Sequence, residues 1–160
     1  MPLVPSRRSA LLGVPVAAIL ASEASAHPQS SARDRIAVAM DRYARAWMSN
    51  DPSIFDLYHP AFTLHYFGRN ALSGDHVGKD ASIRALSELS RRTRAKLVRV
   101  LDTAAGDNHG VLISRIRLGR EGAEVEMDRV MTYTIENAQL RECWQFNQHQ
   151  DLIDELVGPT

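Results

Sequence analysis

The stretch EVEMDRVMTYTIE, residues 124–136, decides the fold of this chain, because it is the longest run in which side chains suited to a strand recur. β-Branched and aromatic residues at alternating positions are typical of a half-buried β-strand. Successive side chains of a strand point to opposite faces of the sheet. One face therefore carries Arg129 among mostly apolar neighbours, and the other carries Asp128 together with Val130 and Thr132.

Two interpretations of this strand remain open. In the first, the apolar face meets helices and Asp128 is solvated. In the second, Asp128, Val130 and Thr132 line a cavity, while Met131 and Tyr133 are buried against the second subunit of a homodimer. A polar group inside a mostly apolar cavity is a common feature of small-molecule sites.

Shorter runs with the same alternation surround this stretch. Together they predict four antiparallel strands joined by short turns, near residues 96–103, 111–118, 125–135 and 140–146. A short strand at residues 62–67 and a loop at residues 68–78 are expected before them. Helical spacing predicts three N-terminal helices and one C-terminal helical turn, at residues 34–50, 52–58, 79–92 and 151–156. This order predicts a single α+β domain in which the N-terminal helices cover one face of a cone-shaped, curved antiparallel sheet.

Composition narrows the classes of function. The chain has 160 residues, of which 44% are apolar, and this is enough for one domain with a real core. Its formal charge is zero, which favours neither nucleic acid nor an acidic membrane surface as a partner. Cys143 is the only cysteine, so no intramolecular disulfide can form, and its place in a predicted strand indicates a buried, inert thiol.

The first 26 residues have the pattern of a secretory leader. Arg7-Arg8 precede an apolar run at residues 10–21, and the small residues Ala24-Ser25-Ala26 predict cleavage before His27. The apolar run is too short to act as a stable membrane anchor. The arginine pair also resembles the twin-arginine export signal.

We therefore expect an exported protein, periplasmic or secreted, with a short linker at residues 27–32 and the folded domain at residues 33–156. A disordered or amphipathic N-terminal arm is the alternative interpretation of the first segment.

Four short motifs occur in a characteristic order along this domain. They are Tyr43 and Trp47 before Asn50-Asp51, then Leu64-His65-Tyr66-Phe67-Gly68, then Gly74 with Gly78-Lys79-Asp80-Ala81, and finally Glu142-Cys143-Trp144-Gln145-Phe146. In order and spacing they resemble the nuclear-transport-factor-2-like superfamily, and within it the SnoaL-like polyketide cyclases and the steroid isomerases. The resemblance implies a cystatin-like roll that binds a hydrophobic small molecule in a conical pocket, and it places Asp128 inside. It therefore favours the second interpretation of the strand, and a sheet with two buried faces is common in homodimers.

The same resemblance suggests catalytic roles. Tyr43 and Asp128 fall where the steroid isomerases keep two hydrogen-bond donors for a developing oxyanion. Tyr66 stands at the position of their catalytic base, yet a neutral tyrosine cannot collect a proton at pH 7. His65 is the natural replacement base, because its reference pKa of about 6.5 suits proton transfer. However, adjacent strand residues face opposite ways, so His65 and Tyr66 cannot enter one cavity without a bulge.

Further side chains are expected to line the pocket on the basis of strand register and the resemblance. They are Trp47, Tyr66, Phe67, Val130, Thr132, Glu142 and Trp144. The histidines have no metal-site spacing, so neither a metal nor a cofactor is expected. If the protein is an enzyme, these residues predict acid-base isomerisation or aldol-type cyclisation next to a carbonyl. The alternative is a non-catalytic carrier or interaction module whose cone is filled by its own side chains.

Overall fold

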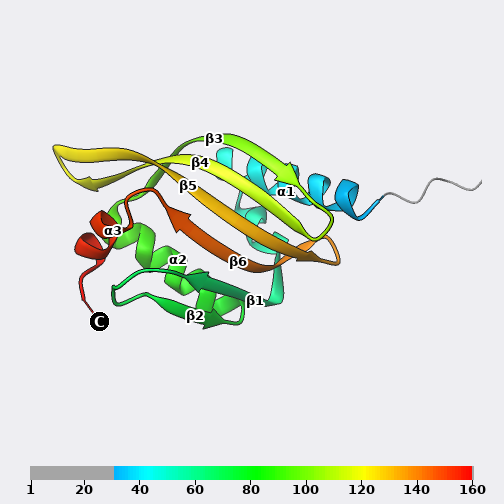
Figure 1. Cartoon of the computed structure of the whole chain (residues 1–160), viewed down its shortest axis with the longest axis horizontal. Helices are drawn as coiled ribbons and strands as arrows, with labels where there is room; N and C mark the ends of the chain where they lie inside the picture. The colour runs from blue at the N-terminus through cyan, green and yellow to red at the C-terminus, as the bar shows by residue number, and fades with distance from the viewer. Residues whose placement is uncertain (1–30, 160) are drawn as a thin grey trace, which may run out of the picture.

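The computed structural model describes residues 31–159, so the predicted export signal and most of the predicted linker lie outside the described residues. The helices are α1 (Ala32–Met48), the 3-10 helix η1 (Pro52–Leu57), α2 (Lys79–Thr93) and α3 (Gln150–Val157). The strands are β1 (Tyr58–Tyr66), β2 (Gly74–Val77), β3 (Lys96–Ala105), β4 (His109–Arg120), β5 (Ala123–Glu136) and β6 (Gln139–Asn147). Figure 1 shows their arrangement.

The six strands form one sheet in the order β2-β1-β6-β5-β4-β3. All neighbours are antiparallel except β1 and β6, which run parallel. The long β4–β5 hairpin is closed by Glu121 and Gly122, and Gly122 has a φ of 77° that suits glycine in a tight turn. The predicted residues 124–136 therefore form most of β5, near the middle of the sheet.

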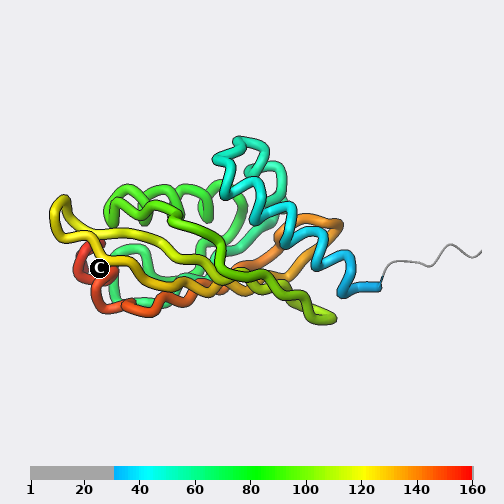
Figure 2. Tube along the Cα trace, turned by 90° about the horizontal axis from the view of Figure 1, so that it is seen from above, coloured from blue at the N-terminus to red at the C-terminus, as the bar shows by residue number. Residues whose placement is uncertain are grey.

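The helices α1, η1 and α2 lie on one side of the curved sheet, as Figure 2 shows. We call the face of the sheet toward these helices the inner face and the opposite one the outer face. The short helix α3 contacts α2 at one end of the sheet, where Arg92 Nη1 donates to the carbonyl of Val157 at 2.8 Å. No helix within residues 31–159 is long and apolar enough to span a bilayer.

Helix α1 begins with a capping box, because Ser31 Oγ accepts from the backbone N–H of Asp34 and the Asp34 carboxylate accepts from that of Ser31. Its buried stripe packs on β3 and β4. Gly110 on β4 permits this close approach, since a Cβ there would lie 2.4 Å from Met40 Cγ. The tight contact fixes how near α1 comes to the inner face.

The predicted α+β fold with helices on one face of a curved sheet is confirmed, and three details differ from the expectation. The segment at 74–77, predicted as loop, is a strand; it lacks apolar alternation and is held by pairing with β1. Strand β1 starts at Tyr58, although His59-Pro60 was expected to end a helix. Pro60 sits where the β1–β6 register shifts, which is a position where a missing N–H is tolerated. The parallel β1–β6 pair was not foreseen.

Ser82 of α2 connects the helix to the sheet. Its buried hydroxyl donates to the carbonyl of His76 at 2.6 Å and accepts from the backbone N–H of Leu64 at 3.2 Å. We expect Ser82→Ala to lower the free energy of unfolding by about 1–3 kcal/mol, because it leaves buried backbone groups without a partner. Chemical denaturation measures this loss.

Ser87→Ala on the same helix is the matched control for this prediction. Ser87 is exposed, so its change is expected to stay within about 0.5 kcal/mol. Equal stabilities of the two variants would show that the Ser82 hydroxyl does not hold α2 to β1.

Candidate functional site

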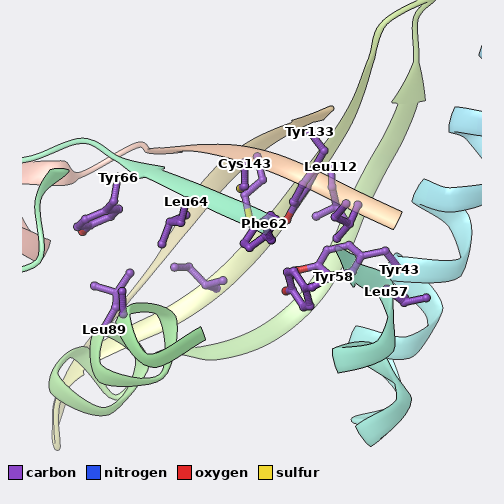
Figure 3. Close-up of a cluster of buried hydrophobic side chains, with 14 of the residues drawn as sticks. Tyr43, Leu57, Tyr58, Phe62, Leu64, Tyr66, Leu89, Leu112, Tyr133 and Cys143 are labelled. Atoms are coloured by element: carbon purple, nitrogen blue, oxygen red, sulfur yellow. Dashed lines mark hydrogen bonds between the residues drawn. The ribbon is translucent and has the colours of Figure 1, made fainter. Parts of the chain in front are cut away.

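A cavity of about 710 Å³ lies between the helices α1, η1 and α2 and the inner face of the sheet. This volume is within the usual range for small-molecule sites. Its interior is lined mainly by buried apolar and aromatic side chains: Tyr43, Ala46, Tyr58, Phe62, Leu89, Ile116, Met131, Tyr133 and Cys143. Figure 3 shows Cys143 and Tyr133 projecting from the sheet toward Phe62 and the neighbouring pair Tyr43 and Tyr58.

The mouth of the cavity is formed by exposed residues of the α1–η1 connection, η1, α2 and the start of β3. They are Asn50, Asp51, Pro52, Phe55, Ser87, Ser90, Arg91 and Lys96. Asp51 is the only carboxylate among the described lining residues, and as the N-cap of η1 it accepts a hydrogen bond from the backbone N–H of Ser53 at 2.9 Å. The interior is therefore apolar and the mouth is polar.

Three buried tyrosines bring hydroxyl groups into this interior. The hydroxyls of Tyr43 and Tyr58 lie 3.0 Å apart, and the Tyr133 ring meets that of Tyr43 edge-on at 5.3 Å. Burial raises the pKa of all three phenols, most strongly for Tyr58 and Tyr133, so they stay neutral at physiological pH. Whichever of Tyr43 and Tyr58 donates in their hydrogen bond, the proton of the other remains available for an oxygen of a ligand.

Arg129 of β5 is the charged group of the cavity wall and is only 7% exposed. Its Nε donates to Asn147 Oδ1 at 2.7 Å, whereas its buried Nη2 has no hydrogen-bond partner among the described residues. No carboxylate within residues 31–159 forms an ion pair with it. Burial lowers the pKa of Arg129 from its ordinary value, but a guanidinium remains charged in proteins.

Gln145 of β6 is the second polar group without partners. It is 0% exposed, lines the cavity, and neither its Oε1 nor its Nε2 has a hydrogen-bond partner among the described residues. Gln145 pairs across the strands with Met131, two positions from Arg129 on the inner face. Buried amides and guanidinium groups are normally satisfied, so this pair marks a polar spot in an apolar chamber.

The structure divides the residues predicted from the sequence between the two faces of the sheet. Tyr43 and Trp47 line the cavity as expected. Tyr66 lies on the inner face but outside the cavity lining, and its hydroxyl accepts from Gln150 Nε2 at 3.2 Å. The remaining predicted residues belong to the outer face: His65, Phe67, Asp128, Val130, Thr132, Glu142 and Trp144.

Asp128 lies outside the cavity, contrary to the expectation that it lines it. Arg115 donates to both of its oxygens, from Nε at 2.9 Å and from Nη2 at 3.2 Å, and the Asp128 side chain is 39% exposed. The hydrogen bonds from Arg115 lower the pKa of Asp128, so it is ionised and has no proton to donate to an oxyanion. The reason is the register: Met127, Met131 and Tyr133 carry the apolar surface that the helices cover, which leaves the Asp128 face outward.

His65 is likewise on the outer face, on the side of the sheet opposite Tyr43. Its ring stacks on Trp144 with centroids 4.8 Å apart, and its Nδ1 lies 2.8 Å from Asp75 Oδ1. Glu142 lies nearby and accepts from Thr134 Oγ1 at 3.3 Å. The structure therefore does not bring His65, Asp128 and Tyr43 together.

Sequence reasoning missed four groups of the cavity, namely Arg129, Gln145, Tyr58 and Tyr133. A usable signal was present for the first two, because each is a polar residue between apolar ones on the face of a strand that otherwise reads as core. Tyr58 was hidden at the boundary between a helix and a strand. Within residues 31–159, no three His, Cys, Asp or Glu side chains come together in an arrangement that could hold a metal.

The buried thiol of Cys143 leads to a prediction about pH. Burial raises its pKa from 9.0 to about 12, so the folded protein keeps a proton that the unfolded chain loses above pH 9. Unfolding then releases a proton, and stability must fall as pH rises between these two values. Cys143 alone should cost about 1 kcal/mol at a pH of about 10, and the buried tyrosines add to the loss.

Urea denaturation at several pH values above about 8, on the wild type and on Cys143→Ala, measures this effect. The variant should lose less stability with rising pH than the wild type does. A denaturation midpoint that is independent of pH in both proteins would contradict the burial of these groups.

Comparison with solved structures places the fold. No family model matches the sequence, and no curated protein matches it. Bal32a from a soil-derived mobile gene cassette is similar, with 20% identity and a TM-score of 0.69 over 80% of this chain and 100% of that one. A protein of unknown function with a cystatin-like fold from Xanthomonas campestris has 18% identity and a TM-score of 0.68, covering 77% and 98%.

A protein assigned as a SnoaL-like polyketide cyclase from Jannaschia sp. CCS1 has 14% identity and a TM-score of 0.62 over 82% of this chain and 98% of that one. Nuclear-transport-factor-2-like proteins of Burkholderia species are further neighbours. The chain thus has the SnoaL-like and nuclear-transport-factor-2-like fold, and the resemblance seen in the sequence is confirmed at the level of the fold.

Proposed function

We propose that this protein binds a hydrophobic small molecule in the cavity between α1, η1, α2 and the inner face of the sheet. The observation that carries the proposal is the composition of the cavity: about 710 Å³ of space with apolar and aromatic walls, and a few buried polar groups that converge on it. Such a combination is the usual construction of a small-molecule site. Tyr43 and Gln145 are well placed to orient an oxygen of the ligand.

Binding without turnover is the function that the cavity supports best. Acid-base chemistry next to a carbonyl needs a base within reach of the substrate. Within residues 31–159, the cavity lining contains no histidine, and its only carboxylate, Asp51, is at the exposed mouth and caps η1. His65, the expected base, is on the other face of the sheet. The cavity therefore favours a carrier or sensor.

Narrowing the mouth tests the location of binding. Ser87 is exposed, lines the mouth and belongs to α2, so Ser87→Phe adds bulk there without disturbing the core. We expect the affinity for the uncharged fluorescent dye N-phenylnaphthylamine to fall by about tenfold or more, because the ring occupies the entrance; this corresponds to about 1.4 kcal/mol. Dye fluorescence titration measures it.

Arg84→Phe is the control, because Arg84 is exposed on the same helix and does not line the cavity. It should bind the dye as the wild type does. Equal loss in both variants, or no loss in either, would place the dye elsewhere and would remove the support for a ligand in this cavity.

We also propose that the protein is a homodimer formed through the outer face. No helix within residues 31–159 covers this face (Figure 2), and Phe67 and Phe146 stack on it at 5.1 Å, each 47% exposed. The same face carries charges of both signs, such as the ion pair of Arg115 with Asp128. A surface with both signs can pair with a second copy of itself. The wild type is expected to have twice the mass of one chain in solution.

Phe146→Glu should convert this dimer to a monomer, because it places a charge where apolar surface is buried between subunits. Phe55→Glu is a matched control, since Phe55 is 48% exposed but belongs to η1. Size-exclusion chromatography with light scattering measures both masses. A monomeric wild type, or a dimer that both variants retain, would contradict pairing through the outer face.

A further inference from the structure

We propose that the ligand of the cavity is an acid: a hydrophobic molecule whose carboxylate, or an oxygen of similar acidity, binds Arg129 with help from Gln145. This inference rests on the proposed function and adds the chemical class of the ligand. The unpaired charge of Arg129 in the cavity wall carries the inference, and the neutral hydroxyls and a mouth without excess negative charge support it.

The first step is the electrostatic cost of Arg129. A buried cation is tolerated when it is paired with an anion and its hydrogen bonds are made. Arg129 meets neither condition in full. No carboxylate within residues 31–159 pairs with it, and its hydrogen bonds are incomplete, because Nε donates to a neutral amide oxygen while Nη2 has no partner. An anion arriving in the cavity would supply both the missing charge and the missing acceptor.

The second step is the position of the guanidinium. Arg129 Nε is held by Asn147 Oδ1, Asn147 Nδ2 donates to Gln150 Oε1 at 2.8 Å, and Gln150 Nε2 donates to Asp154 Oδ1 at 2.9 Å. These amides fix one edge of the guanidinium. Nη2, beside the bound Nε, has no partner and is the donor left for the ligand. Because Asp154 is reached only through two amides, it does not neutralise Arg129 as a direct ion pair would.

The third step is the shape of the recognition site. A carboxylate has two oxygens, and the site has two unsatisfied donors on the inner face, Arg129 Nη2 and Gln145 Nε2. Arg129 and Gln145 are diagonal neighbours across β5 and β6, within reach of one anionic group. Charged hydrogen bonds of this kind are stronger than neutral ones.

The fourth step is the absence of repulsion. The buried phenols of Tyr43, Tyr58 and Tyr133 stay neutral, because burial raises their pKa, so they do not repel an anion, and the proton that the Tyr43–Tyr58 pair leaves over can be donated to it. Of the lining side chains three are basic, Arg91, Lys96 and Arg129, and one is acidic, Asp51. Arg91 is paired with Glu88 at 2.6 Å, so Lys96 and Asp51 leave the mouth without an excess of negative charge that would repel an acid.

The experiment compares two probes of nearly equal shape, naphthylacetic acid and its neutral amide, naphthylacetamide. Calorimetric titration of the whole protein near neutral pH should show the acid binding about thirtyfold tighter or more, as for a desolvated charge pair. Arg129→Met should abolish the preference and bring the acid down to the affinity of the amide. Arg129→Lys should keep part of the preference, because it keeps the charge but loses the fixed fork of donors.

Arg84→Met is the matched control, since it removes an exposed arginine outside the cavity and should leave the preference unchanged. Circular dichroism confirms folding of Arg129→Met, whose melting temperature without ligand should equal or exceed that of the wild type, because an unpaired buried charge is replaced by an apolar side chain. If the neutral dye N-phenylnaphthylamine binds the wild type but the acid shows no preference over the amide, the inference is overturned while the proposed function stands. If the dye and both probes all fail to bind, the proposed function fails with it.

Discussion

The strict alternation of side chains along β5 determines which residues lie on the inner face of the sheet and which on the outer face. Adjacent residues must face opposite ways, so Asp128 and Arg129 could not both enter the helical side of the sheet. The helices bury Met127, Met131 and Tyr133, and Arg129 is buried with them because it lies on the same face. The cavity has a buried cation because the energy of burying Met127, Met131 and Tyr133 exceeds the cost of burying one guanidinium among them.

The order of the elements was largely predictable from the sequence, because long segments with a clear period of two or 3.6 are read with confidence. Helix α2 and strands β3 to β6 were predicted close to their final bounds. The strand at 74–77 was not, since its four residues have no periodicity and depend on hydrogen bonds to a partner distant in the sequence. The parallel pairing of β1 with β6 is also a tertiary property that no local pattern encodes.

The candidate site was harder to predict, because it depends on which face of the sheet the helices cover. The alternation separated Asp128 from Arg129 correctly, but the choice between the two faces followed a resemblance to steroid isomerases. A comparison of apolar area would have favoured the Arg129 face, since Met131 and Tyr133 lie on it. Tyr43 and Trp47 were placed in the cavity because a helical stripe next to a sheet leaves little choice of direction.

Hydrogen bonds that run from the Asn147 amide through the Gln150 amide to the Asp154 carboxylate connect Arg129 to the C-terminal helix α3. The turn of helix α3 that carries Gln150 and Asp154 is also clamped by Asn70, whose Nδ2 donates to Asp154 at 2.6 Å. Helix α3 therefore acts as a brace for the cavity wall, although it contributes no side chain to the lining. A tag or truncation that pulls this helix away would release the guanidinium from its fixed orientation, so a change at the C-terminus would lower the selectivity of a cavity whose mouth is formed by other elements.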